Sequence, residues 1–379
     1  INCDFEDFSV VKRTNSPAVA VVGCGNRVLR NRMHNAPHMA ISYDGNEHLI
    51  QGNEIFNVCY ETSDVGAIYS CRTWSYRGVR IDNNYIHDLT TSHGTGSAAV
   101  YLDDMTSGGI VTNNLFVNIA GRTMLMGGGR DNVIENNIQL NNGNGLGYHY
   151  DNRGQGWASG AGTAPDGNNY AEWNKLKTDS RYQVQTWSRK YPELVEMPLN
   201  HNGVCTEALQ PAGAVIQNNL CVGVGNPYGS ISSVVQSLGT VKENHSCPKG
   251  TDIGFVNAAA QNFAVKSGSL ITDKLGDRYF DASQAGLYED EYRTGLGVEV
   301  SAPQLTAPAD RAEDLSIAAG ITFRWEAAEG AGSYLLEIAK DEEFLEPVLQ
   351  ATMTGCQYTA ASMEKNAKYA DQKNWWRRR

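Results

Sequence analysis

The chain has 379 residues, a formal net charge of −11 and a pI near 5.2. Such an acidic balance argues against nucleic acid or an anionic membrane surface as the partner. No apolar run approaches the roughly 20 residues that span a bilayer. The length is enough for a full hydrophobic core and a second domain. We therefore expect a protein of two domains without a membrane span.

The eight cysteines show neither a CxxC pair nor the spacing of a zinc site. Buried cysteine behaves as a small hydrophobe. We expect free structural thiols rather than disulfides, and no metal site built from cysteine.

One short phrase recurs along the chain: a β-branched apolar residue, two further positions, then asparagine. It is clearest in VRIDNNYIHD, IVTNNLFVN and VIENNIQLN. The seven occurrences lie at 28–31, 50–53, 81–84, 111–114, 134–137, 216–219 and 241–244, with spacings of 22, 31, 30, 23, 82 and 25 residues. Apart from the one long gap, these periods are typical of a solenoid.

The units are rich in β-branched residues and separated by Gly, Asn and Asp, which predicts short strands and turns. Stacking them gives an all-β fold, a right-handed parallel β-helix. The recurrent asparagine tolerates the left-handed backbone of a tight corner, and its amide can donate and accept along a column of turns about 4.8 Å apart. The predicted internal ladder is Asn31, Asn53, Asn84, Asn114, Asn137, Asn219 and Asn244.

After each ladder asparagine we expect a turn and then a second strand, in HMAISYDG, VGAIYSCR, AAVYLDDM, RTMLMGGGRD and GLGYHYDN. Alternation places Ser42, Tyr69 and Tyr101 outward. It places five residues in the core: Ile41, Ile68, Val100, Met124 and Leu146. The polar residues expected close together at the strand ends are Asp44, Arg72, Asp103, Asp104, Arg130, Asp131, His149 and Asp151.

Two segments depart from the repeat. Residues 152–213 form an insertion with a helical piece around 173–191, which either lies beside the functional face or caps a sheet edge. Beyond Pro303 the pattern changes to strands with a tryptophan closing one and a tyrosine opening the next, which resembles a fibronectin type III-like sandwich. The predicted domains are the β-helix at 1–297 and a small, truncated β-sandwich at 298–379.

Cleaving a polysaccharide needs two carboxyl groups, one to protonate the leaving oxygen and one to attack or to activate water. The first candidates are Asp103 and Asp104, consecutive at the end of AVYLDDM. The second carboxylate is Asp64, from the preceding coil, or one of Asp44 and Asp151, which are nearer by alignment. Alternation favours Asp103 over Asp104. The competing interpretation is that each of them is an aspartate that caps a turn.

Other residues near these strand ends are candidates for binding substrate. Arg72, Arg130 and Arg153 can bind a carboxylated sugar or form salt bridges. His149 and Asp151 can hydrogen-bond a sugar. The aromatic candidates, which either stack on sugar rings or form cross-strand ladders, are Tyr69, Tyr101 and Trp157.

Five phrases together carry a resemblance: DVGAIYSCRTW, VYLDDMTSG, GGGRDNVIENNI, DNRGQGW and WSRKYPELVEM. In this order they resemble bacterial right-handed parallel β-helix proteins that act on carbohydrates, similar to glycoside hydrolase family 141, over about residues 25 to 295. The resemblance implies hydrolysis of fucosyl or xylosyl linkages by two aspartates. By motif these are Asp64 and one of the pair Asp103 and Asp104.

We therefore expect a secreted or periplasmic monomer that hydrolyses a plant or host polysaccharide or oligosaccharide, without a cofactor. One alternative is a polysaccharide lyase on the same scaffold, with Ca²⁺ held by acidic side chains. The residues that could hold it are Asp44, Asp103, Asp104, Asp131 and Asp151. A third interpretation is a carbohydrate-binding β-helix without catalysis.

Overall fold

The computed structural model describes residues 1–71, 75–90, 97–140, 146–154, 185–195, 210–258, 261–294, 305–309, 312, 315, 320–327, 334–339, 347–353 and 355–361. The chain divides into two compact units, Ile1–Tyr288 and Glu289–Arg379, whereas the sequence pattern places the end of the first domain at residue 297. Within the described ranges, no helix is long and apolar enough to cross a membrane.

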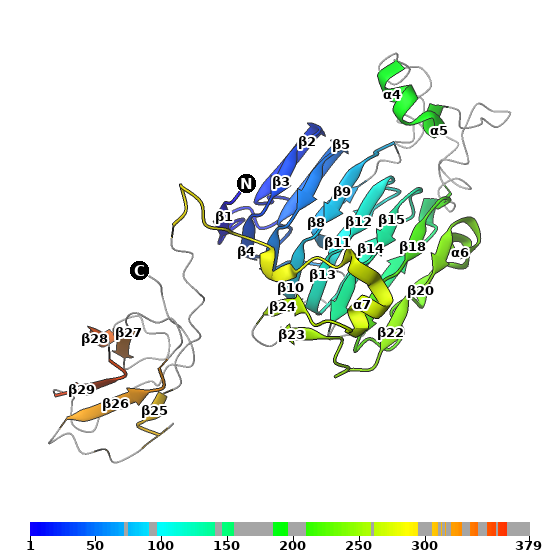
Figure 1. Ribbon diagram of the computed structural model, residues 1–379. Helices are drawn as coiled ribbons and strands as arrows, with labels where there is room; N and C mark the ends of the chain where they lie inside the picture. Colours follow the sequence, from blue (N-terminus) through cyan, green and yellow to red (C-terminus); the bar gives the residue numbers. More distant parts are fainter. Residues whose placement is uncertain are drawn as a thin grey trace. The chain divides into compact units, whose positions relative to one another are not determined.

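Three parallel sheets, named here A, B and C, build the first unit (Figure 1). Sheet A contains β1 (Asp4–Glu6), β4 (Arg32–Ala36), β7 (Glu54–Val58), β10 (Tyr85–Leu89), β13 (Leu115–Ile119), β16 (Ile138–Leu140), β19 (Leu220–Val222) and β22 (His245–Cys247). Sheet B contains β2 (Val19–Cys24), β5 (Ile41–Asn46), β8 (Val65–Cys71), β11 (Ser97–Asp103), β14 (Arg122–Met126), β17 (Tyr148–Tyr150) and β20 (Ser230–Ile231). Sheet C contains β3 (Arg27–Leu29), β6 (Leu49–Gln51), β9 (Val79–Asp82), β12 (Gly109–Thr112), β15 (Val133–Glu135), β18 (Val215–Gln217) and β21 (Thr240–Lys242).

The chain visits the sheets in the fixed order A, B, C, so each coil contributes one strand to every sheet. The sequence pattern predicts two strands in a coil and a turn after the ladder asparagine. The structure instead has a strand of sheet A directly after that asparagine, as at Asn84, which is followed at once by β10. The corner is only two residues long because one left-handed residue bends the backbone there.

The predicted asparagine ladder is confirmed. The Asn84 side chain accepts from the backbone N–H and the side-chain amide of Asn53, at 3.0 and 2.9 Å. It donates to the side-chain oxygen of Asn114 at 2.9 Å. The same links join Asn31, Asn53, Asn84, Asn114, Asn137, Asn219 and Asn244 in one column. These amides therefore satisfy one another along the coil stack, where all but Asn244 are buried.

The left-handed backbone lies one residue earlier than the sequence pattern predicts. The residues with positive φ are those just before the ladder, such as Asn83 (φ 55°), Asn113 (φ 56°) and Asn136 (φ 56°). Two neighbouring residues at each corner thus have different roles. The first residue bends the chain, and the second forms hydrogen bonds with the asparagines of the neighbouring coils.

The predicted inward face of sheet B is confirmed for its first four positions. Ile41 pairs with Ile68, Ile68 with Val100 and Val100 with Met124, and all four are 0% exposed. The fifth prediction, Leu146, is wrong. Tyr148 pairs with Met124 and is buried, because β17 begins two residues later than the alternation implies.

The insertion and the last coil carry short helices. Helix α4 (Gln185–Lys190) lies within the helical piece predicted around 173–191, of which residues 173–184 lie outside the described ranges. Helix α5 (Pro192–Val195) follows the predicted piece. Helix α6 (Ser233–Leu238) connects β20 to β21.

A closing segment after the last coil packs on the outer face of sheet A. It contains β23 (Phe255–Asn257), β24 (Asn262–Val265), α7 (Leu270–Leu275) and the 3-10 helices η3 (Gly276–Arg278) and η4 (Ala282–Gln284). Its apolar residues and those of sheet A form a second core: Tyr85, Leu115, Ile138, Leu140, Leu220, Val222, Ile253, Phe255, Phe263, Ile271, Leu275 and Ala282. Apolar outward residues in β13, β16 and β19 are thus removed from water.

A buried histidine lies on the same outer face of sheet A. The ring of His87 is stacked between Tyr85, at 4.1 Å, and Phe56, at 4.8 Å. Its Nδ1 lies 2.8 Å from Asp88, and its Nε2 lies 3.5 Å from Glu54. Burial by itself lowers the pKa of His87, but the hydrogen bonds to Asp88 and Glu54 outweigh it, so the pKa is raised.

This raised pKa predicts a pH-dependent contribution to stability. His87 binds its proton more tightly when folded, so its contribution is fully present below the unfolded pKa of about 6.5 and is lost as pH rises through the folded pKa. We expect the free energy of unfolding of the wild type to exceed that of His87→Gln at acid pH, with a gap that narrows at alkaline pH. Urea denaturation of both proteins across the pH range measures this gap, and a gap that does not change with pH contradicts the assignment.

The second unit contains antiparallel sheets. One sheet joins β25 (Leu305–Ala307), β26 (Ile321–Trp325) and β29 (Gln357–Ala360), and the other joins β27 (Tyr334–Ala339) and β28 (Pro347–Met353). Trp325 closes β26 and Tyr334 opens β27, as the sequence predicts. The likeness to a fibronectin type III domain stays a prediction.

Candidate functional site

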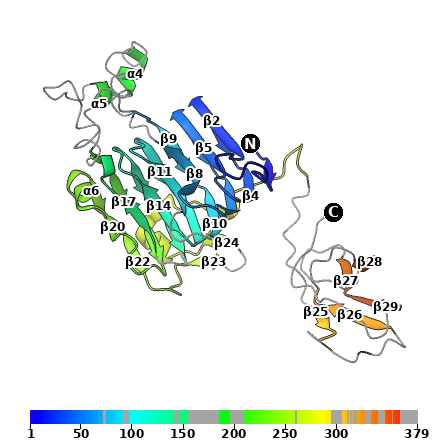
Figure 2. The same cartoon turned by 180° about the vertical axis from the view of Figure 1, so that it is seen from behind.

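Polar residues gather at the carboxyl ends of the sheet B strands, which Figure 2 shows side by side. Asp103 pairs with Cys71 in β8. Gly127 and Asp151 follow the paired ends of β14 and β17, so they continue the same outward column over the next two coils. Two carboxylates thus stand in one column, separated by a coil that carries no side chain at this position.

Asp103 is held from several directions. One of its oxygens accepts the Tyr69 hydroxyl at 3.0 Å. The other accepts the Asp104 backbone N–H at 2.8 Å and the Arg153 guanidinium at 2.7 Å. Asp104 has a left-handed backbone, with φ 36°, so the chain turns at this residue and both carboxylates reach Arg153, Asp104 at 3.3 Å. This turn removes the alternation that would otherwise separate consecutive aspartates.

Arg153 connects this pair to Asp151. Its Nη2 and Nε donate to one Asp151 oxygen at 2.8 and 3.0 Å, and its backbone N–H donates to the other at 3.0 Å. His149 lies 3.2 Å from the same carboxylate. The guanidinium therefore bridges carboxylates that are two coils apart.

Asp64 joins the group through a tyrosine. The Tyr101 hydroxyl donates to Asp64 at 3.1 Å and also interacts with the carboxyl group of Asp103. One tyrosine hydroxyl therefore connects the carboxyl groups of Asp64 and Asp103. Asp64, Asp103, Asp104, Asp151 and Arg153 are hereafter called the carboxylate cluster.

Exposure differs sharply within the cluster. Asp103 and Asp104 are each 7% exposed, whereas Asp64 is exposed and Arg153 is half-buried. The Tyr101 ring is only 3% exposed and meets Tyr69 edge-on at 5.3 Å. A sugar ring therefore has no free face of Tyr101 on which to stack, and this tyrosine acts through its hydroxyl.

The surroundings shift the acidities in opposite directions. Burial raises the pKa of Asp103, and the Asp104 carboxylate raises it further, against the hydrogen bonds from Tyr101 and Tyr69. Burial also raises the pKa of Asp151, but His149 and Arg153 outweigh it and hold the value at about 2. The pKa of Asp103 is thus raised above its ordinary value, while that of Asp151 is lowered.

A second polar group, beyond the turn from sheet B to sheet C, contains Arg130. Its guanidinium lies 2.9 Å from Asp131, which also binds the buried Arg77 at 2.7 Å. Arg77 lies 3.5 Å from Glu193 of α5, so this ion pair ties the insertion to the coils. Asp131 therefore serves the anchoring of the insertion and does not reach the carboxylate cluster.

A further ion pair of the insertion and a hydrogen bond between two coils lie near this group. Lys190 of α4 binds Glu47 at 2.6 Å, and Tyr76 donates to Asp44. Arg72 and Trp157, which the sequence singles out for binding substrate, lie outside the described residues.

Sequence patterns do not identify Gly127 or Arg77. A Cβ atom on Gly127 would lie 2.8 Å from the Arg153 guanidinium carbon, so glycine is required where that side chain crosses. The run GGGRD gives a weak signal for this position. Arg77 has no such signal, because its partner Glu193 comes from the insertion.

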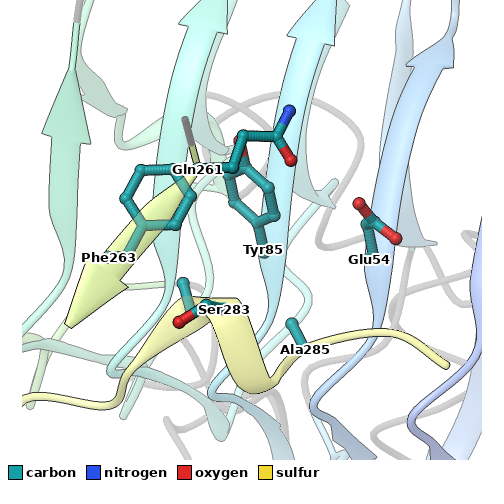
Figure 3. Close-up of a pocket in the computed structure, with 7 residues that line it drawn as sticks. Glu54, Tyr85, Gln261, Phe263, Ser283 and Ala285 are labelled. Carbon is teal, nitrogen blue, oxygen red and sulfur yellow. The ribbon is translucent and has the colours of Figure 1, made fainter. Parts of the chain in front are cut away.

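A separate pocket of about 100 Å³ lies between sheet A and the closing segment (Figure 3). Glu54 and Tyr85 line it from sheet A, and Gln261, Phe263 and Ser283 line it from the closing segment. It lies on a different sheet from the carboxylate cluster. In the described part of the chain, no group of three or more His, Cys, Asp or Glu residues is arranged to hold a metal ion.

Comparison with known proteins identifies the scaffold. A family model described as "Right handed beta helix region" matches residues 17–158, a range that includes the whole carboxylate cluster. The fold is a right-handed parallel β-helix. No curated protein and no solved structure matches the chain. This β-helix is a scaffold common among polysaccharide-active enzymes and carbohydrate-binding proteins.

Proposed function

We propose that the carboxylate cluster hydrolyses glycosidic bonds, with Asp103 as the general acid and Asp64 as the nucleophile. The observation that carries this proposal is the Tyr101 hydroxyl, which interacts with both carboxyl groups. Two carboxyl groups that share one tyrosine hydroxyl suit a retaining glycosidase, in which the two carboxyls stand only about 5 to 5.5 Å apart.

The two environments fit the two roles. A general acid must hold a proton near neutral pH, and burial raises the pKa of Asp103 in that direction. A nucleophile must reach the anomeric carbon, and Asp64 is exposed while Tyr101 orients its oxygen. Asp103 protonates the leaving oxygen as Asp64 attacks. Asp103 then takes a proton from a water molecule whose oxygen attacks the anomeric carbon, and the bond between that carbon and Asp64 breaks.

The resemblance to glycoside hydrolase family 141 supports a fucosyl or xylosyl linkage in a plant or host polysaccharide as the substrate. The protein would act as a secreted or periplasmic monomer. A screen of fucosylated, xylan and pectic glycans tests this assignment. Hydrolysis gives a new reducing end, whereas a lyase gives an unsaturated uronate that absorbs ultraviolet light.

The low exposure of Asp103 and Asp104 favours one competing function, a β-helix that binds carbohydrate without cleaving it. In that case the ion pairs with Arg153 serve only the fold. If none of the screened glycans that bind is cleaved, this competing function replaces the hydrolase.

A further inference from the structure

We propose that Arg153 is a positioning residue that fixes the Asp103 carboxyl group and sets the pH at which Asp103 exchanges its proton. This inference rests on the proposed function, in which Asp103 is the acid. It assigns to Arg153 an internal role in place of the contact with substrate that the sequence predicts.

The Arg153 guanidinium bridges Asp151 and Asp103 in a fixed geometry. Asp151 holds the guanidinium through Nη2 and Nε, at 2.8 and 3.0 Å, which leaves Nη1 directed at Asp103 at 2.7 Å. The backbone N–H of Arg153 also binds Asp151, at 3.0 Å, so the base of the side chain is fixed as well. A planar guanidinium held in this way presents its remaining donor in one direction.

The Arg153 side chain crosses the neighbouring coil at a glycine. Arg153 starts from the coil of β17 and reaches the coil of β11, so it crosses the coil of β14, where Gly127 stands. A Cβ on Gly127 would lie 2.8 Å from both Cζ and Nη1 of Arg153, and 2.8 Å from the Asp104 backbone nitrogen. The absence of a side chain at this position is therefore a condition for the bridge.

The charged and titratable groups that face Asp103 come from three of the four neighbouring coils' strands and turns, and the coil of β14 contributes only a glycine. From β8 come Tyr69 and Cys71, from β11 and its turn come Tyr101 and Asp104, from β14 comes only Gly127, and from the residues after β17 comes Arg153. Arg153 is the cation among these described residues. Burial and Asp104 favour the protonated acid, and Arg153 favours the carboxylate. The balance between them sets the midpoint of the Asp103 titration.

The experiment measures that midpoint directly. The protein is labelled with ¹³C at the aspartate side-chain carboxyls, and the resonance missing from Asp103→Asn identifies Asp103. In Arg153→Gln the midpoint should rise by about one to three pH units, which is the effect of removing an opposite charge at this distance. Gly127→Ala, which displaces the guanidinium, should shift it in the same direction, and Arg153→Lys should restore part of the wild-type value.

Arg130→Gln is the matched control, because Arg130 forms its ion pair with Asp131 and should leave the midpoint unchanged. For the active enzyme, the alkaline limb of kcat/KM should move to higher pH together with the midpoint. A folded Arg153→Gln protein with an unchanged Asp103 midpoint overturns the inference. A wild type that cleaves no glycan overturns the proposed function alone, since the titration needs no turnover.

Discussion

Asp103→Asn should lower kcat/KM for a natural glycan by roughly 10²- to 10⁴-fold, the usual contribution of general acid–base catalysis. Asparagine has nearly the shape of aspartate but carries no proton for the leaving oxygen. Its one side-chain oxygen can still accept from Arg153 and the Asp104 backbone N–H, and its NH2 group can donate to the Tyr69 hydroxyl, so the Kd for the intact glycan should change little. The measurement pairs steady-state kinetics with calorimetric binding to the same oligosaccharide. Equal turnover by variant and wild type would exclude Asp103 as the acid.

The proposed nucleophile gives a companion result. In Asp64→Ala, azide can occupy the vacated space and displace an activated leaving group, which yields a glycosyl azide of inverted configuration. In Asp103→Ala, azide should intercept the sugar bound to Asp64 and give the retained configuration. Nuclear magnetic resonance of the anomeric proton distinguishes the two products. Asp273→Asn is the control, because Asp273 lies on α7 with a side chain 66% exposed.

The scaffold can be predicted from the sequence because its signal is repeated. The unit of a β-branched residue and asparagine three positions later recurs wherever sheet C meets sheet A. The one long spacing, of 82 residues, does not hide that recurrence. The paired positions Ile50, Ile81 and Val111 of sheet C show that the repeat also encodes the register. The Leu146 error is local by comparison, since a shift of two residues keeps the alternation and leaves no trace in the pattern.

The hydrogen bonds and ion pairs of the site depend on distances between coils, which no local sequence pattern contains. Asp103 is recognisable because it ends a strand of the repeat, and Asp64 because it opens the phrase DVGAIYSCRTW. Their connection through Tyr101 depends on how closely β8 and β11 approach, and a Cβ on Gly66 would lie 2.6 Å from that of Tyr101. The Arg153 bridge depends on a side chain crossing a whole coil. Such distances follow from stacking, which only the folded chain provides.

The carboxylate cluster forms only when the coils are stacked. The asparagine ladder, which joins the coils, should therefore stabilise the cluster as well as the scaffold. Asn84 is 0% exposed. Besides its links to Asn53 and Asn114, it donates to the carbonyl oxygens of Ile50, at 3.0 Å, and Asp82, at 3.2 Å. Alanine at this position would leave several buried donors and acceptors without partners, each at a cost of about 1 to 3 kcal/mol.

Asn84→Ala should thus lower the free energy of unfolding by roughly 3 to 5 kcal/mol. Asn244→Ala makes the same chemical change at the end of the ladder, where Asn244 is partly exposed and water can replace its bonds to Asn219 and Ile216. We expect a loss of only about 1 kcal/mol there. Urea denaturation followed by circular dichroism compares the two variants. Equal losses at both positions would mean that the ladder is a row of independent turns, and the register of Asp64 and Asp103 would then have to come from packing alone.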